Sequence, residues 1–167
     1  MPLKKLCLPH TYTSVYYCLP HQMKKSITKV TGGSFSQTLE QFENLNHIVI
    51  IEQQQQDLNN DTFNWKLPKI VTKITSFNYS AFGFIQNNKS IKKLKLLDRS
   101  MDDIRFLLFL KDLSSSPECT HVQTFIYGCS FNCHIPNDLY INLNYTIKYS
   151  RTSLDYNFTQ YLKFTRN

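Results

Sequence analysis

The order of strand-like and helix-like segments along residues 1–113 constrains the fold of this chain most. Residues 3–8 and 48–51 carry the short apolar and β-branched runs that are typical of strands. Between them, apolar residues recur every three or four positions from Val15 to Val30, which is the period of an amphipathic helix. Pro20 interrupts this helical pattern, and Gly32 lies where a helix would end. The first half of the region therefore predicts a strand, an interrupted helix and a second strand.

The second half of this region predicts the same kinds of element again. Residues 77–85 are rich in aromatic side chains and predict a buried strand, which includes Phe82 and Phe84. A short helix is expected over residues 91–97 behind Asn88 as its N-cap, and a strongly hydrophobic strand over residues 104–111. The order strand, helix, strand, strand, helix, strand predicts an α+β, ferredoxin-like domain, with a four-stranded antiparallel sheet and two helices on one face.

Two further segments surround this expected core. Residues 52–76 contain a polar, glutamine-rich stretch and predict a loop insertion, and residues 114–167 predict a C-terminal extension behind a serine-rich linker. Within the extension, apolar and polar residues alternate from Leu139 to Tyr149, a pattern that predicts a strand with one apolar face. An exposed apolar face of this kind has to pack against something. The strand could join an edge of the sheet, pack on the face of the sheet that has no helices, or contact a neighbouring subunit, and we expect contact with a neighbouring subunit.

The composition limits the classes of partner. The chain has 167 residues, 41% of them hydrophobic, which suits one soluble domain, and it contains no apolar run long enough for a membrane helix. Its formal net charge of +7 permits binding to nucleic acid or to an acidic protein. A lysine-rich and asparagine-rich composition without functional meaning explains the same charge equally well. Five cysteines without a preceding hydrophobic signal segment favour a reducing compartment.

A basic cluster is the clearest candidate for contact with RNA. Such a cluster would supply the salt-dependent phosphate contacts of RNA binding, and the alternative is a solvated helix face. The candidate residues are Lys89, Lys92, Lys93, Lys95 and Arg99.

A second cluster has the chemistry of a metal site. Thiolates and imidazoles are zinc ligands, and this group offers five of them within 16 residues, although free thiols and ordinary histidines are the simpler alternative. The candidates are Cys119, His121, Cys129, Cys133 and His134. A neighbouring subunit could share such a site. No nucleophile elbow, zinc-protease motif or phosphate-binding glycine loop occurs, so we expect no enzyme and no other cofactor.

Several segments in order resemble one family. A glycine turn at Gly32–Gly33 leads into residues 38–42 and the apolar residues 48–50. The aromatic residues 79–85, the segment 91–97 and the run Arg99-Ser-Met-Asp-Asp-Ile-Arg-Phe-Leu-Leu follow. Together they resemble the bacterial-type small-subunit ribosomal protein six family in its mitochondrial form, over residues 1–113. The insertion at residues 52–76 departs from that pattern, and so does the stretch 43–46, Glu-Asn-Leu-Asn, which replaces the basic stretch of the family's second strand.

The resemblance implies a function and a location. It implies a structural constituent of the small subunit of the mitochondrial ribosome, which contacts rRNA, pairs with small-subunit ribosomal protein eighteen and resides in the mitochondrial matrix. The C-terminal extension would then contact neighbouring ribosomal proteins. The alternative is a ferredoxin-like protein-interaction or regulatory module without a role in the ribosome.

Overall fold

A computed structural model describes residues 2–7, 18–32, 37–51, 67–77, 85–97, 103–129, 145–150 and 160–167. The first strands and helical turns are β1 (Lys5–Cys7), α2 (His21–Ser26), β2 (Lys29–Gly32), η1 (Gln37–Gln41), β3 (His47–Ile50), β4 (Lys73–Ser76) and β5 (Lys93–Leu96). They are followed by α4 (Asp103–Ser115), η4 (Pro117–Cys119), β6 (Thr124–Cys129), β7 (Tyr145–Ser150) and β8 (Gln160–Arg166).

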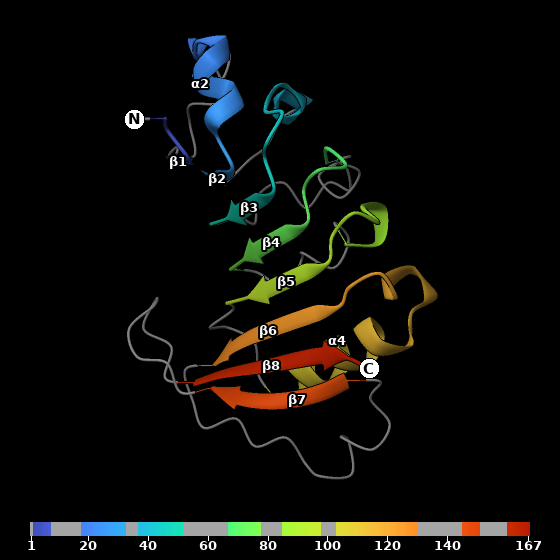
Figure 1. Ribbon diagram of the computed structural model, residues 1–167. Coiled ribbons are helices and arrows are strands. Elements are labelled where there is room, and N and C mark those ends of the chain that lie inside the picture. The colour runs from blue at the N-terminus through green and yellow to red at the C-terminus, as the bar shows by residue number, and fades with distance from the viewer. Residues whose placement is uncertain are drawn as a thin grey trace, which may run out of the picture.

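The described strands form one eight-stranded mixed sheet. Its order is β1-β2-β3-β4-β5-β6-β8-β7, so the first six strands lie side by side in the order of the sequence (Figure 1). Each of these six strands is parallel to the next. Consecutive parallel strands require the chain to return to the same end of the sheet each time. The helical turns α2 and η1 accordingly lie at the end where the strands begin.

The six parallel strands are successive turns of a solenoid. The pairing register makes positions 5, 29, 47, 73, 93 and 124 equivalent, so one turn takes between 18 and 31 residues. At each step, the first strand residue and the residue before it both donate their backbone N–H groups to one carbonyl of the preceding turn, over 2.9–3.2 Å. The accepting carbonyls belong to Lys4, Thr28, Asn46, Thr72 and Lys92. The backbone thus repeats regularly although the turns differ in length.

One face of the sheet carries the hydrophobic core. In the second to sixth turns, three positions point into it: the residue that lies two positions before the strand, and two alternate residues of the strand. In the third turn these are Leu45, Ile48 and Ile50, each at most 5% exposed. Because side chains alternate along a strand, the remaining strand positions project from the opposite face, which we call the open face.

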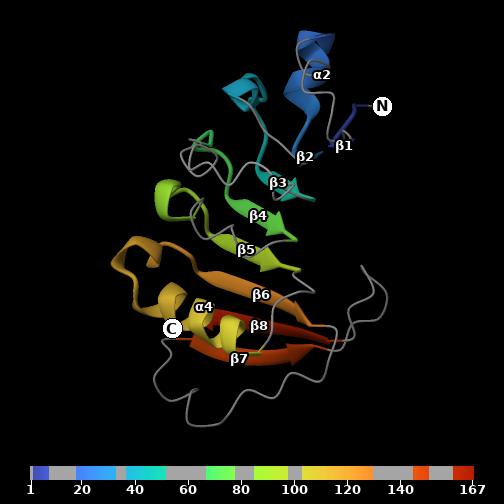
Figure 2. The ribbon, with the colours of Figure 1, turned by 180° about the vertical axis from the view of Figure 1, so that it is seen from behind.

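The C-terminal end of the solenoid is closed by antiparallel pairing and by a helix. Strand β8 lies between β6 and β7 and is antiparallel to both. Helix α4 covers the core face behind these strands, as Figure 2 shows from the reverse side. Its Phe106 ring stacks on Tyr127, with 4.0 Å between the centroids, and lies near Phe125 and Phe164. This aromatic cluster joins helix α4 to β6 and β8.

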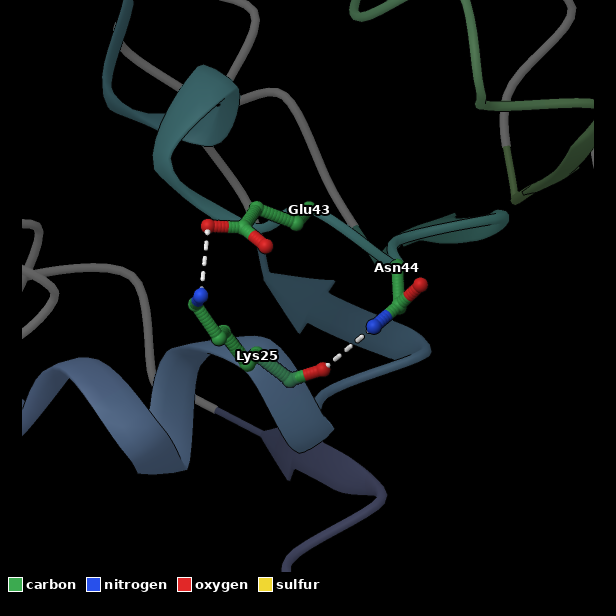
Figure 3. A network of polar contacts seen from close by, with 3 residues as sticks. All are labelled: Lys25, Glu43 and Asn44. Carbon is green, nitrogen blue, oxygen red and sulfur yellow. Dashed lines mark hydrogen bonds and ion pairs between the residues drawn. The ribbon is translucent and has the colours of Figure 1, made fainter.

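Polar contacts join neighbouring turns at the other end of the solenoid (Figure 3). The Asn44 side-chain amide donates to the Lys25 carbonyl oxygen over 2.8 Å, and the Lys25 ammonium lies 3.4 Å from a Glu43 carboxylate oxygen. Both ion-pair partners are about half exposed, so solvent screens the pair and it adds less than about 1 kcal/mol. These contacts set the position of the loop before β3 against the end of α2.

The expected ferredoxin-like fold is wrong. The structure has an eight-stranded mixed sheet whose first six strands are parallel, whereas a ferredoxin-like domain has four antiparallel strands with two helices on one face. Residues 93–96, expected in a helix, form β5, and residues 104–111, expected as a strand, lie in α4. In the described part of the expected first helix, residues 21–26 form α2 and residues 29–32 form β2.

Other expectations have different outcomes. The strands expected over residues 3–8 and 48–51 are present as β1 and β3. The alternating segment includes β7, while residues 139–144 lie outside the described residues, as do Phe82 and Phe84. Strand β4 falls within residues 52–76, for which the sequence predicts a loop insertion. Among the described residues, no helix is long and apolar enough to cross a membrane.

Candidate functional site

The open face carries a row of basic side chains at equivalent positions of successive strands. We call Lys5, Lys29, His47, Lys73 and Lys93 the basic row; they lie on β1 to β5 in register. Neighbouring strands are about 4.8 Å apart, so the row extends for about 19 Å across the sheet. In β6, β8 and β7 the corresponding positions are Thr124, Thr165 and Thr146. The basic row is therefore confined to the parallel part of the sheet.

A second row of open-face positions lies two residues further along each strand. Its middle is recessed, because Val49 is 3% exposed and Thr75 is 6% exposed. Lys95 continues the row on β5, where its ammonium lies 4.6 Å from the centre of the Tyr161 ring. On the open face, the ammonium groups of the lysines therefore lie beside the nearly buried side chains of Val49 and Thr75.

His47 lies at the centre of the basic row and is held neutral by its surroundings. Burial, and after it the positive charges of Lys29, Lys73, Lys93 and Lys95, together lower the pKa of His47 from 6.5 to about 4. Its Nε2 atom lies 3.0 Å from the Thr75 hydroxyl oxygen. The imidazole is therefore an uncharged hydrogen-bonding group among ammonium groups near neutral pH.

The positive charges of neighbouring lysines in the row repel one another. The pKa of Lys93 is lowered by burial and then by the positive charges of Lys73 and Lys163. Among the described residues, no carboxylate forms an ion pair with Lys29, Lys73 or Lys93. Like charges directly opposite each other destabilise a sheet. This arrangement can accept an anionic group from outside the chain.

The structure separates the five basic residues that the sequence singled out. Lys93 and Lys95 project from the open face, and Lys92 lies directly before β5 and is exposed. Lys89 lies in the preceding turn, where its ammonium donates to the Glu118 carbonyl oxygen over 2.7 Å. Arg99 lies outside the described residues. The sequence therefore identified two residues of the open face.

The sequence reasoning missed four members of the basic row. Lys5, Lys29, His47 and Lys73 are scattered along the chain, and only the strand register brings them together. A recurring six-residue pattern would have identified them. Its first and fourth residues are apolar, its third is basic or polar, its sixth is apolar or small, and its second and fifth can be any residue. It occurs at residues 3–8, 27–32, 45–50, 71–76, 91–96 and 122–127.

The expected metal ligands are only partly described. Cys119 is fully buried, and burial raises the pKa of its thiol. Burial lowers the pKa of His121, with Lys89 and Lys92 adding to the effect. Cys133 and His134 lie outside the described residues, and the side chain of Cys129 is likewise not described. Among the described residues, no three His, Cys, Asp or Glu side chains are grouped so that they could hold a metal ion.

A hollow of about 430 Å³ lies at the first turns of the solenoid, where Lys25 and Asn44 contribute to its lining. Several of its polar groups already bind the chain itself. The Ser26 hydroxyl donates to the Leu3 carbonyl oxygen, and the Thr28 hydroxyl donates to the Lys4 carbonyl oxygen. The hollow is thus a space between two turns whose polar groups are used in contacts within the chain. We therefore take the open face as the candidate binding site.

Comparisons with known proteins give no match. No family model, no curated protein and no solved structure matches this chain.

Proposed function

We propose that this chain is a protein-interaction module that binds its partner through the open face of the solenoid sheet. The observation that carries the proposal is the basic row: five in-register side chains on a face that no described helix covers. Solenoids use the extended surface formed by their repeats for binding. Leucine-rich repeats are one such class, and the six-residue pattern of this chain is similar to their strand motif Leu-x-x-Leu-x-Leu. The asparagine or cysteine that follows in that motif is absent here.

Binding fits this face better than catalysis does. A catalytic site needs a nucleophile or an acid–base pair within hydrogen-bonding reach, usually in a cleft. On the open face the described polar pair is His47 with Thr75, and it is surrounded by ammonium groups. The proposal therefore assigns the face to recognition, and no reaction step is derived.

The role in the small subunit of the mitochondrial ribosome remains a prediction of the family resemblance. That resemblance relied on the order of elements in a ferredoxin-like domain, and the structure has a different order. Contact with rRNA, pairing with small-subunit ribosomal protein eighteen and location in the mitochondrial matrix keep no support from the fold. The alternative, a ferredoxin-like interaction or regulatory module, loses its fold as well, but the open face supports a role in protein interaction independently of any family.

The proposal can be tested by affinity capture with matched variants. The tagged chain and the variant K73E/K93E are compared by quantitative mass spectrometry of captured proteins. The control is K69E/K111E, which changes the net charge equally at two exposed lysines outside the open face. We expect a partner that wild type and control retain and that K73E/K93E loses. Equal capture by all three proteins would contradict the proposal.

A further inference from the structure

The open face has a positive charge that the described part of the chain does not neutralise. Lys5 and Lys73 are exposed, and Lys29 and Lys93 are half-buried. The acidic residues with described side chains lie elsewhere: Glu40 and Glu43 before β3, Asp112 on α4 and Glu118 in η4. A ligand with several negative charges would therefore replace repulsion along the basic row with attraction.

The chemistry of the face distinguishes between two polyanions. Proteins that bind single-stranded nucleic acid combine positive charge with exposed aromatic rings, on which bases stack. The described aromatic rings of this face include Tyr161, which is only 5% exposed and carries the Lys95 ammonium over it, and Phe77, which is partly buried against Leu97 and Tyr161, so neither ring is exposed for stacking. Arginine, the residue that grips phosphate in a bidentate manner, is absent from the basic row. The face lacks the two features that favour nucleic acid.

The length of the basic row and the groups along it suit a polypeptide. An extended chain of about six residues spans the ~19 Å of the basic row. Val49 and Thr75 beside the row are only 3% and 6% exposed, so a bound chain would contact the more exposed side chains of the basic row itself. The neutral His47 offers a hydrogen bond at the middle of the row without adding to the repulsion.

We infer that the open face binds an acidic polypeptide segment, which crosses the strands with its carboxylates along Lys29, Lys73 and Lys93. This inference rests on the proposed function and identifies the partner by its chemistry. The segment lies across the strands, since the ammonium groups are arranged in that direction. It needs no exposed sheet edge, so it differs from the addition of a further strand.

The test measures binding of a fluorescein-labelled deca-glutamate peptide by fluorescence anisotropy at several salt concentrations. We expect binding that weakens as salt increases, and a loss of at least about fivefold in affinity for K73Q/K93Q, because two charge contacts are removed. K69Q/K111Q has the same net charge and should bind as the wild type does. Circular dichroism of each variant confirms that it is folded.

The control peptides decide between the alternatives. A deca-uridine RNA should bind more weakly than the acidic peptide; tighter binding of the RNA that also depends on Lys73 and Lys93 would overturn the inference. Equal losses for both lysine pairs would show attraction to net charge only and would also overturn it. If the inference fails in either way while K73E/K93E still loses its captured partner, the proposed function stands and only the acidic nature of the partner is rejected.

Discussion

At the scale of single residues, the protonation of His47 is coupled to folding. Its pKa falls from 6.5 to about 4 through burial and the nearby lysines. Between these two values the unfolded chain binds a proton that the folded chain does not, so this residue reduces stability as the pH falls from 6.5 towards 4.

The variant H47Q tests this linkage. Glutamine keeps a hydrogen-bonding group beside Thr75 and cannot be protonated, so the variant should lose less stability between pH 7 and pH 4.5. We expect the wild type to lose about 1–2 kcal/mol more than the variant over that range, which allows for solvent screening of a half-buried group. Urea unfolding at several pH values measures the difference. Parallel stability curves for the two proteins would show that His47 is not the source.

Arg166 is the residue that holds the C-terminal end together. Its guanidinium donates to the carbonyl oxygens of Leu113, Cys119 and Val122 and to the Tyr145 hydroxyl, over 2.8–3.4 Å. It also lies over the Tyr145 ring, 4.9 Å from its centre. One side chain therefore connects β8 with the end of α4, with η4, with the turn before β6 and with β7.

We expect R166K to destabilise the chain by about 2–3 kcal/mol, because an ammonium group cannot reach several carbonyls at once and hydrogen bonds to charged groups are strong. Y145F removes only the 2.8 Å contact and should cost about 1 kcal/mol. K163Q, an exposed change on the same strand, is the control and should remain within about 0.5 kcal/mol of the wild type. A stability of R166K equal to that of the control would contradict this role.

At the scale of elements, some strands could be predicted from the sequence and others could not, and the difference has a physical reason. The β-branched run at residues 48–51 has no other stable interpretation, and it forms β3. Residues 91–97 have apolar side chains three positions apart, which indicates a helix in isolation. In the structure Ile91 ends a turn and Leu94 lies in β5, yet both face the same core. A turn followed by a strand thus imitates the helical spacing.

In the candidate site, too, some residues could be predicted from the sequence and others could not. Lys93 and Lys95 are neighbours in the sequence and could be identified as part of a basic surface. Their association with Lys29, His47 and Lys73 depends on contacts between turns that are 18 to 26 residues apart, which local patterns do not encode. Only the recurrence of the six-residue pattern carries that information.

Helix α4 provides a direct test of the corrected element. Phe106, Phe109, Leu110 and Leu113 are buried, whereas Ile104 is 71% and Leu108 is 56% exposed. This spacing is helical, and an alternating strand would place Ile104, Phe106 and Leu108 on one face.

We therefore expect F106A to cost about 3–5 kcal/mol, since it removes a buried ring from the aromatic cluster. L108A should change the stability by less than about 0.5 kcal/mol, because its side chain is largely exposed. Thermal and urea unfolding of the two variants give the comparison. Similar losses for both variants would contradict the helical assignment.

At the scale of the whole molecule, the stability of a solenoid is a sum over neighbouring turns, so its two ends need not be equally stable. Strand β1 has three residues and one neighbouring strand, and Leu3 and Met23 near it are 38% and 37% exposed. Strands β6 and β8 each have neighbours on both sides and lie against the aromatic cluster of α4. Strands β6 and β8 carry the buried side chains of Phe125, Tyr127, Leu162 and Phe164, whereas the core residue of β1 is the partly buried Leu6.

We expect the backbone amides of β1 and β2 to exchange their hydrogens at least about tenfold faster than those of β6 and β8, because the first turns can open without disturbing the last ones. Hydrogen–deuterium exchange followed by mass spectrometry measures both ends in one sample. In R166K, which loosens the C-terminal end, exchange should accelerate in β6 and β8 and remain unchanged in β1 and β2. Equal exchange rates in all strands would instead show that the sheet opens as one cooperative unit, and the nearest-neighbour description of this solenoid would fail.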